Sequence, residues 1–287
     1  MIAQCLSAAQ RTVPHNFTIH SMHCYFVLPG HSQIPILYHV EHVREGKSFA
    51  TRTVQARQKG KCIFTTTMSF VRENSGGKKV VSHAVAMPKD IKPPVETAEQ
   101  VELENKIAAF SPFITQRLEI LNGDSTRPDE KRTRQWVKAN GKISPEGGYQ
   151  AHLSALAYMS DSYFIGTISR IHNLLGWGPR DKNKVKVPAE LAAYAKKLDE
   201  AEGLGDDLGN DQGKRPEVGM MVSLDHTIYF HEPRSFRADE WMFTEMHSPW
   251  AGDGRGVVTQ HMFASDGTLL ATCFQEVSFY SFLTCPR

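Results

Sequence analysis

Three polar residues in the second half of the 287-residue chain occupy positions where an apolar side chain would be the more stable choice: Asp161, Ser223 and Gln275. Asp161 ends an apolar helical stretch, where a carboxylate faces the negative end of the helix dipole. Ser223 begins the predicted strand 223–230. An unpaired carboxamide at Gln275 costs about 1–3 kcal/mol, because this residue shares one strand face with Ala271, Cys273, Val277 and Phe279. Stability alone does not select these residue types, so the pattern indicates a site.

The chemistry of this set is that of water activation. It combines a carboxylate, a hydroxyl and a carboxamide without a cysteine, a lysine or a metal ligand, which favours attack by water over a covalent adduct with the protein. The chain has no GxSxG or HExxH motif, and the Gly-Lys-Ser at 46–48 follows Glu41 where a phosphate-binding loop needs glycine. His20 and His23 lie three residues apart on a predicted strand and therefore on opposite faces, so we expect no shared metal.

Helix followed by sheet occurs twice along the chain, and the repeat is visible at single residues. The Tyr-Phe pair at 25–26 matches the pair at 229–230, and the strands around Gly60 match those around Gly267 at an offset of 207. The first-copy counterparts of the three polar residues lie at or near Arg11, Ile19 and Met68. The carboxylate, the hydroxyl and the carboxamide therefore occur together in one copy only, which strengthens the prediction of a site there.

The elements that must position these residues predict an α+β fold. Each repeat is a helix on an antiparallel sheet, and the two join into one continuous sheet, which removes an exposed edge from each copy. The first repeat is predicted over 1–72 and the second over 148–287. The helices are predicted at 2–10 and 152–159, and the strands within 20–71 and 222–279.

Two further segments are predicted from their composition. Residues 73–147 are rich in Pro, Gly and charged residues and are predicted to be a linker. An insertion at about 172–218 interrupts the second repeat as a surface excursion, with a helix at 188–201 and a mobile stretch at 203–211. This insertion is also a candidate lid over the binding site.

Composition restricts the partners and the compartment. Thirty-three Lys and Arg against 31 Asp and Glu give a net charge of +2 without a basic stripe, which argues against nucleic-acid binding. The five cysteines lie far apart and form no CxxC pair, which argues against a disulfide framework and favours a reducing compartment. No apolar run approaches 18 residues and the first nine residues do not resemble a signal peptide, so we expect an intracellular protein without a membrane span.

At these residues the sequence resembles the type II acyl-CoA thioesterases, which are double hotdog proteins. The loop Ser-Pro-Trp-Ala-Gly at 248–252 resembles the eukaryotic peroxisomal branch in particular. The other matching stretches are HSMHCYF at 20–26, REGKSF at 44–49, GKCIF at 60–64, AYMSD at 157–161, SLDHTIYFH at 223–231 and DGTLLATCFQE at 266–276. The resemblance covers most of the chain, and it implies that each repeat is one hotdog.

The resemblance also assigns roles to residues. The family's catalytic triad falls on Asp161, Ser223 and Gln275, which together would orient the attacking water. His20 matches a histidine once considered for catalysis, and it ranks lower because it lies in the other copy. The family's strand before the first helix has no equivalent in this sequence, so the first hotdog is predicted to lack that strand.

The resemblance implies that fatty acyl-CoA is hydrolysed to a free fatty acid and coenzyme A, with the thioester as substrate and no cofactor. The acyl chain would lie in an apolar tunnel between helix and sheet. The basic residues that bind the coenzyme A phosphates are not identifiable, and homo-oligomer formation is left open. Kinship implies a peroxisomal location, although residues 284–287 (Thr-Cys-Pro-Arg) differ from a Ser-Lys-Leu type address; the cytoplasm is the alternative.

Two other functions stay open on the sequence. A hotdog enoyl-CoA hydratase would need an Asp and a His placed to add water, and Asp225 and His226 offer both residue types. Strand alternation, however, predicts that Asp225 shares the face of Ser223 and that His226 points away. The other alternative is a non-catalytic acyl-CoA binding or scaffold protein, which would agree with a first hotdog that lacks a strand.

Overall fold

The computed structural model of the chain describes residues 1–75, 81–107, 110–172, 174, 188–202 and 220–280. In this part of the chain, eleven strands form one sheet in the order β2-β3-β4-β1-β8-β11-β10-β9-β6-β5, and the short β7 pairs with β11. The strands before residue 75 are β1 Phe17–Phe26, β2 Leu37–Glu45, β3 Phe49–Gln58 and β4 Lys61–Arg72. The later strands are β5 Phe113–Leu121, β6 Arg132–Ala139, β7 Met220–Ser223, β8 Asp225–Phe230, β9 Met242–Gly252, β10 Arg255–Ala264 and β11 Leu269–Tyr280.

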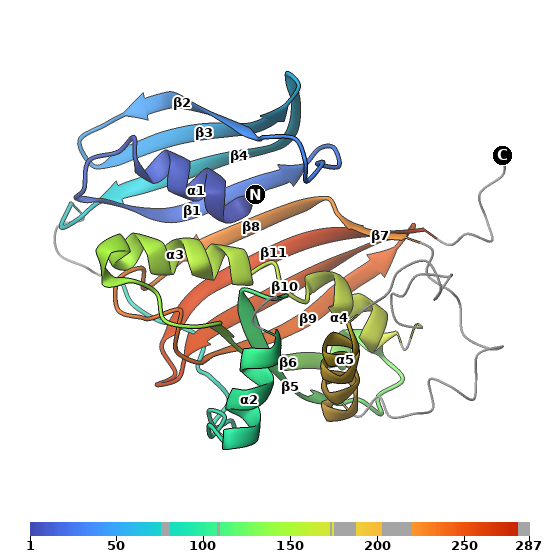
Figure 1. Cartoon of the computed structure of the whole chain (residues 1–287). Helices are drawn as coiled ribbons and strands as arrows, with labels where there is room; N and C mark the ends of the chain where they lie inside the picture. Colours follow the sequence, from blue (N-terminus) through green and yellow to red (C-terminus); the bar gives the residue numbers. More distant parts are fainter. Residues whose placement is uncertain (76–80, 108–109, 173, 175–187, 203–219, 281–287) are drawn as a thin grey trace, which may run out of the picture.

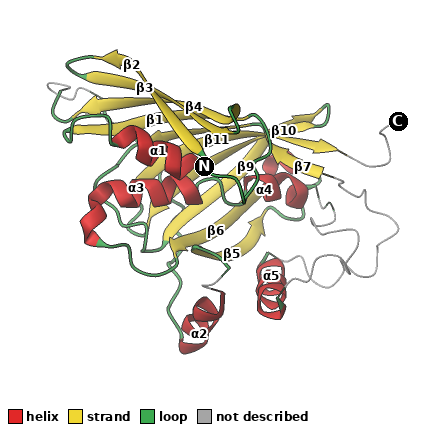
Figure 2. Ribbon diagram, turned by 45° about the horizontal axis from the view of Figure 1, so that its top comes forward, coloured by secondary structure: helices red, strands yellow, loops and turns green. Residues whose placement is uncertain are grey.

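Helices α1, α3 and α4 cover one face of this sheet (Figures 1 and 2). The helices are α1 Ile2–Gln10, α2 Ala98–Ile107, α3 Gly148–Met159, α4 Phe164–Ile171 and α5 Ala189–Ala201, with short 3-10 helices at Pro128–Glu130 and Pro145–Gly147. A smaller apolar cluster lies on the opposite face. Successive residues of a strand point to opposite faces of the sheet, and Val137 joins the main core, whereas its neighbour Trp136 packs with Phe243 and Phe263. No described helix is long and apolar enough to cross a membrane.

The two predicted repeats are recognisable in the packing. On β4, Phe64, Thr66, Met68 and Phe70 are buried, and 207 positions later Ala271, Cys273, Gln275 and Val277 are buried on β11. In α1, residues Ile2, Cys5, Leu6 and Ala9 form one buried stripe, which is the spacing of a helix that lies on a sheet. The turn between β3 and β4 has positive φ at Lys59 (46°) and Gly60 (77°), as a two-residue hairpin of this kind requires.

The two repeats meet at β1 and β8, which pair antiparallel with Met22 opposite Ile228, His23 opposite Thr227 and Cys24 opposite His226. The shift of 204 positions that aligns Tyr25 with Tyr229 exchanges the pairs Met22–Ile228 and Cys24–His226 and maps the pair His23–Thr227 onto itself. The repeats are therefore related by an approximate two-fold axis at His23 and Thr227. Each repeat covers the edge strand of the other, and the prediction of one continuous sheet is confirmed.

The linker predicted over 73–147 is corrected by the structure. This segment contains α2, β5 and β6, and β6 pairs with β9, so both strands extend the sheet of the second repeat. The polar residues of both strands resemble those of a linker. Strand β5 is one of the two edge strands of the sheet, where charged residues are common, and the interior strand β6 also carries Arg132, Arg134 and Lys138. Strands β5 and β6 precede α3 in the chain, whereas no described strand precedes α1.

The insertion predicted at 172–218 is described over α5, and the predicted mobile stretch 203–211 lies outside the described residues. Helix α5 follows Pro188, as its position at a helix start predicts. The helix packs on β5: Thr115 N donates to Tyr194 Oη at 2.9 Å, Tyr194 Oη donates to Thr115 O at 2.6 Å, and Leu198 is buried. The described part of the insertion is thus docked on the sheet.

Candidate active site

Asp161 lies in the turn 160–163, which joins the end of α3 at Met159 to the start of α4 at Phe164. Asp161 lines a cavity of about 250 Å³. The other lining residues are Met1, Ile2, Phe26, Phe113, Tyr158 and Ser162. Burial raises the pKa of Asp161 to about 6, and the hydrogen bond from Gln275 acts in the opposite direction. A carboxyl group of this kind can gain or lose a proton near neutral pH.

Gln275 meets Asp161 across the core, from the face of β11 that points to the helices. Gln275 Nε2 donates to Asp161 Oδ1 at 2.6 Å, although the two residues are far apart in the sequence. The amide nitrogen must face this oxygen, because a carboxylate only accepts hydrogen bonds. Gln275 Oε1 is buried and has no partner among the described residues. Two of the three predicted site residues are therefore in direct contact, and a free acceptor lies beside them.

His226 completes the contact, and the sequence pattern did not place it in the site. Its imidazole is fully buried, and burial lowers its pKa to about 3, so the ring is neutral. Ser160 Oγ donates to Ala157 O at 3.0 Å and lies 2.9 Å from His226 Nε2. The hydroxyl proton is thereby used, so Nε2 carries the ring proton, and His226 Nδ1 accepts from Gln275 Nε2 at 3.4 Å.

The predicted direction of His226 was wrong, and the cause is an irregularity at Leu224. The strand breaks there between β7 and β8, and Leu224 N donates to Glu276 O at 2.9 Å. Because of this break, His226 reaches the face that carries Gln275. Asp225 has a structural role, since its Oδ1 accepts from Glu276 N at 2.6 Å and ties β8 to β11.

Ser223 lies on the same face as Gln275 but one step further along. It is the Cα partner of Val277 in the antiparallel pairing of β7 with β11, so the side chains of Ser223, Val277 and Gln275 project to one side. Ser223 makes no hydrogen bond with Asp161 or Gln275 in the described structure. The register makes Ser223 a diagonal neighbour of Gln275, with roughly 7 Å between the two backbone positions, so both side chains can reach toward one shared water molecule.

His20 lies in the first repeat, where its Nε2 is 2.8 Å from Ser69 Oγ and its ring packs against Phe49 at 5.7 Å between centroids. The structure does not bring it to Asp161 or Gln275.

The sequence contains a signal for His226. At the offset of 204, the residue of the first repeat that corresponds to His226 is Met22. With Ser223 and Gln275, His226 is thus the third polar replacement of an apolar residue in the second copy.

Comparisons with known proteins show the family of the chain. The sequence model of the acyl-CoA thioesterase N-terminal domain matches residues 1–71, and that of the acyl-CoA thioesterase C-terminal domain matches residues 88–279. Acyl-coenzyme A thioesterase 8 of Rattus norvegicus is 34% identical, over 96% of this chain and 77% of the relative. Acyl-CoA thioesterase 2 of Haemophilus influenzae is 30% identical, over 96% and 84%.

Solved structures show the same fold. Acyl-CoA thioesterase II TesB2 from Mycobacterium marinum has a TM-score of 0.65 and 27% identity, over 97% of this chain and 87% of that one. A hot dog fold protein from Alicyclobacillus acidocaldarius, 18% identical over 98% and 85%, has a TM-score of 0.57 and shares the fold. The fold and these matches define a double hotdog thioester hydrolase. The chain belongs to the acyl-CoA thioesterase family, and the predicted family, fold class and enzyme class are confirmed.

Proposed function

We propose that this chain hydrolyses fatty acyl-CoA to a free fatty acid and coenzyme A at Asp161, Ser223 and Gln275. The observation that carries the assignment of these residues is the contact of Asp161 with Gln275 beside an apolar-walled cavity. A carboxylate with a pKa of about 6 is a suitable general base near neutral pH, because it is ionised and still basic enough to accept a proton. No metal or organic cofactor takes part in the proposed reaction.

The orientation of the Gln275 amide defines where the attacking water would bind. Both hydrogens of its Nε2 are used, one toward Asp161 and one toward His226, which leaves Oε1 as a free acceptor. A water molecule can donate one hydrogen to Gln275 Oε1 and the other to the second carboxylate oxygen of Asp161. If the Ser223 hydroxyl donates to one lone pair of this water, the other lone pair is left to attack the thioester carbon.

In the proposed reaction, Asp161 takes a proton from this water while the water oxygen bonds to the thioester carbon. The tetrahedral intermediate then breaks its carbon–sulfur bond, and the thiolate of coenzyme A receives the proton from Asp161. Because a thiolate is a good leaving group, a strong protein nucleophile is not needed. Backbone N–H groups near the carbonyl oxygen would stabilise the oxyanion.

The cavity is proposed to hold the part of the substrate next to the thioester. Phe26, Phe113 and Ile2 give it apolar walls, and the Phe113 and Tyr158 rings pack edge to face at 5.8 Å between centroids. Apolar walls with few polar groups are typical of sites for lipid substrates. A peroxisomal location is proposed on kinship, since a 23% identical relative in Saccharomyces cerevisiae is a peroxisomal acyl-coenzyme A thioester hydrolase.

The test is release of free thiol from acyl-CoA substrates of increasing chain length by the purified chain. We expect release that is linear with enzyme and lost in Asp161→Asn. Hydration of crotonyl-CoA without thiol release would instead identify an enoyl-CoA hydratase. Tight binding of palmitoyl-CoA with no release would identify a non-catalytic binding protein.

A further inference from the structure

The turn 160–163 is held at every residue by a different part of the fold. Such anchoring is unusual for a short connection between two helices, because turns normally lie at the surface with few contacts. The contacts are Ser160 with His226 of β8, Asp161 with Gln275 of β11, Ser162 with Gln135 of β6 at 3.3 Å, and Tyr163 with two arginines. The position of Asp161 therefore depends on its neighbours in the turn as well as on Gln275.

Tyr163 is the anchor that depends on the two arginines. The guanidinium carbon of Arg117, on β5, lies 4.3 Å from the centroid of its ring, and that of Arg170, on α4, lies 4.8 Å away. Tyr163 has a φ of 79°, which is unfavourable for a bulky residue and persists only where surrounding contacts enforce it. Gly166 makes room for the ring, since a Cβ there would approach it to 2.9 Å. Tyr163 Oη is buried and has no partner among the described residues.

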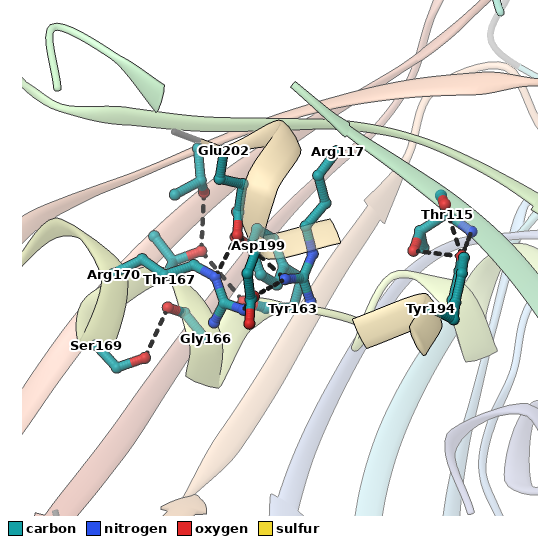
Figure 3. A network of polar contacts seen from close by, with 11 residues as sticks. Thr115, Arg117, Tyr163, Gly166, Thr167, Ser169, Arg170, Tyr194, Asp199 and Glu202 are labelled. Atoms are coloured by element: carbon teal, nitrogen blue, oxygen red, sulfur yellow. Dashed lines mark hydrogen bonds and ion pairs between the residues drawn. The ribbon is translucent and has the colours of Figure 1, made fainter. Parts of the chain in front are cut away.

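Helix α5 and its C-cap neutralise the two arginines (Figure 3). Asp199 Oδ1 accepts from Arg117 at 3.2 Å and from Arg170 at 3.0 Å, and Glu202 Oε2 accepts from the same two side chains at 3.1 and 2.6 Å. The Glu202 side chain is fully buried. Two guanidinium groups that share the same acceptors would repel each other without these carboxylates. The contact of both arginines with Tyr163 thus depends on a helix from the insertion.

We infer that Arg117, Arg170, Asp199 and Glu202 form a clamp that acts through Tyr163 to position Asp161. The inference rests on the proposed function, in which Asp161 is the general base, and it makes the four clamp residues and Tyr163 positioning residues. Release of the ring lets the turn shift, and a shift of about 1 Å in a catalytic group can cost up to ~10²-fold in rate. The insertion contributes to catalysis in this way, whether or not it covers the acyl chain.

The experiment compares Tyr163→Leu, which removes the ring, with Tyr163→Phe, which keeps the ring and removes only the unpartnered hydroxyl. We expect kcat for palmitoyl-CoA to fall ~10-fold or more in Tyr163→Leu, with KM within about twofold of the wild type. Tyr163→Phe should keep kcat within about twofold. Equal losses in the two variants, or an unchanged kcat in Tyr163→Leu, would overturn the inference.

Two more variants keep the test decisive if Tyr163→Leu does not fold. Glu202→Gln keeps the shape of the side chain and removes its charge, so kcat should fall roughly 3–10-fold with little change in KM. Glu200→Gln is the matched control, because it makes the same change at an exposed carboxylate of the same helix, whose ion pair with Lys196 at 3.7 Å lies outside the clamp, and its kcat should stay unchanged. A kcat loss in Glu200→Gln equal to that in Glu202→Gln would reduce the clamp to a structural role. If the wild type and Asp161→Asn are equally inactive, the proposed function fails; if only Asp161→Asn is inactive and Glu202→Gln is not slowed, the clamp fails.

Discussion

The two repeats solve the same packing problem with different side chains at three equivalent positions. Ile19, Met22 and Met68 fill the core face of the first repeat and are essentially inaccessible to solvent. Ser223, His226 and Gln275 occupy these positions in the second. The sheet tolerates both sets, so the fold does not require polar groups there. Within the second set, His226 and Gln275 form a connected chain of hydrogen bonds that ends on Asp161, which the first repeat cannot form.

The first repeat also contains a buried polar side chain, Arg52, and the contrast with Gln275 separates structure from function. Arg52 donates to Thr12 twice and to Arg44 O, Thr51 O and Glu45 Oε1, so every hydrogen of its guanidinium has an acceptor. Gln275 leaves Oε1 without a partner in the described structure. A fully satisfied buried polar group holds elements together, whereas the free acceptor of Gln275, next to Asp161, is the place that we propose for the attacking water. Each experiment below tests this difference between the repeats.

The largest effect is expected at Asp161. Asp161→Asn keeps the shape and one acceptor but removes the base, so kcat for thiol release should fall ~10³-fold, within the range for loss of a general base. Arg11→Ala, close to the equivalent position of the first repeat, should leave kcat unchanged. Steady-state kinetics on both purified variants provides the measurement, and comparable turnover in the two would remove Asp161 from the mechanism.

The next effect is expected from exchange of Gln275 for its first-repeat counterpart. Gln275→Met should lower kcat ~10²-fold, because the acceptor for the water and the donor to Asp161 are both lost. The fold should be retained, since Met68 is buried in the same environment. The reverse exchange, Met68→Gln, should leave kcat unchanged and lower the free energy of unfolding by about 1–3 kcal/mol, measured by urea denaturation. Loss of activity in Met68→Gln would mean that the repeats are not functionally distinct.

On the acid side of its pH profile, kcat is expected to fall about tenfold per pH unit. Burial raises the pKa of Asp161 from 3.8 to about 6, so the base is ionised above pH 6 and kcat should fall as the pH drops below that value. Burial lowers the pKa of His226 to about 3, so this residue stays neutral around pH 6. Burial also raises the thiol pKa of Cys24 and Cys273.

The raised pKa of Asp161 also affects the free energy of unfolding. A raised carboxyl pKa means that the folded state binds the proton more tightly than the unfolded state, so ionisation of Asp161 destabilises the fold as pH rises through the window from about 4 to 6. At pH 8, Asp161→Asn should be more stable than the wild type by on the order of 2–3 kcal/mol. The difference should vanish below about pH 4. An acid limb of kcat well below pH 5 would contradict the assignment of Asp161 as the titrating group.

A smaller effect is expected at His226. Replacement by the first-repeat residue, His226→Met, leaves Gln275 free to rotate its amide, and kcat should fall ~10-fold, the value of one or two neutral hydrogen bonds. The fold should be as stable as that of the wild type or more so, which thermal unfolding can check. A loss as large as that in Asp161→Asn would indicate that His226 itself takes part in proton transfer.

The smallest effect is expected at Ser223, which would contact the water and not the other site residues. Ser223→Ala should lower kcat roughly 3–10-fold, since only one hydrogen bond to the water is lost. Ser278→Ala, which removes a hydroxyl that bonds Gly254 O on the neighbouring hairpin, is the control and should be neutral in kcat. A neutral Ser223→Ala would reduce the proposed triad to Asp161 and Gln275.

Part of the fold and the site was predictable from local patterns. The burial of alternate residues on β4 and β11 follows from a period-two pattern, and the repeat offset marks Gln275 as an exception. Strand β5 was missed because an edge strand is polar enough to resemble a linker, and β6 was missed because its Arg132, Arg134 and Lys138 hide the short buried run at Trp136 and Val137. The direction of His226 was missed because the alternation continues through Leu224 in the sequence and breaks there in the structure.

The sequence by itself determined the duplicated fold and the residue types that can activate water, because these depend on periodicity and on the internal repeat, and its motifs carried the resemblance to the family. The tertiary structure alone decided that Gln275 donates to Asp161, that His226 orients the amide, and that α5 reaches the turn through Arg117 and Arg170. These contacts join residues far apart in the chain, and strand register and helix docking fix them. Local pattern carries no information about either.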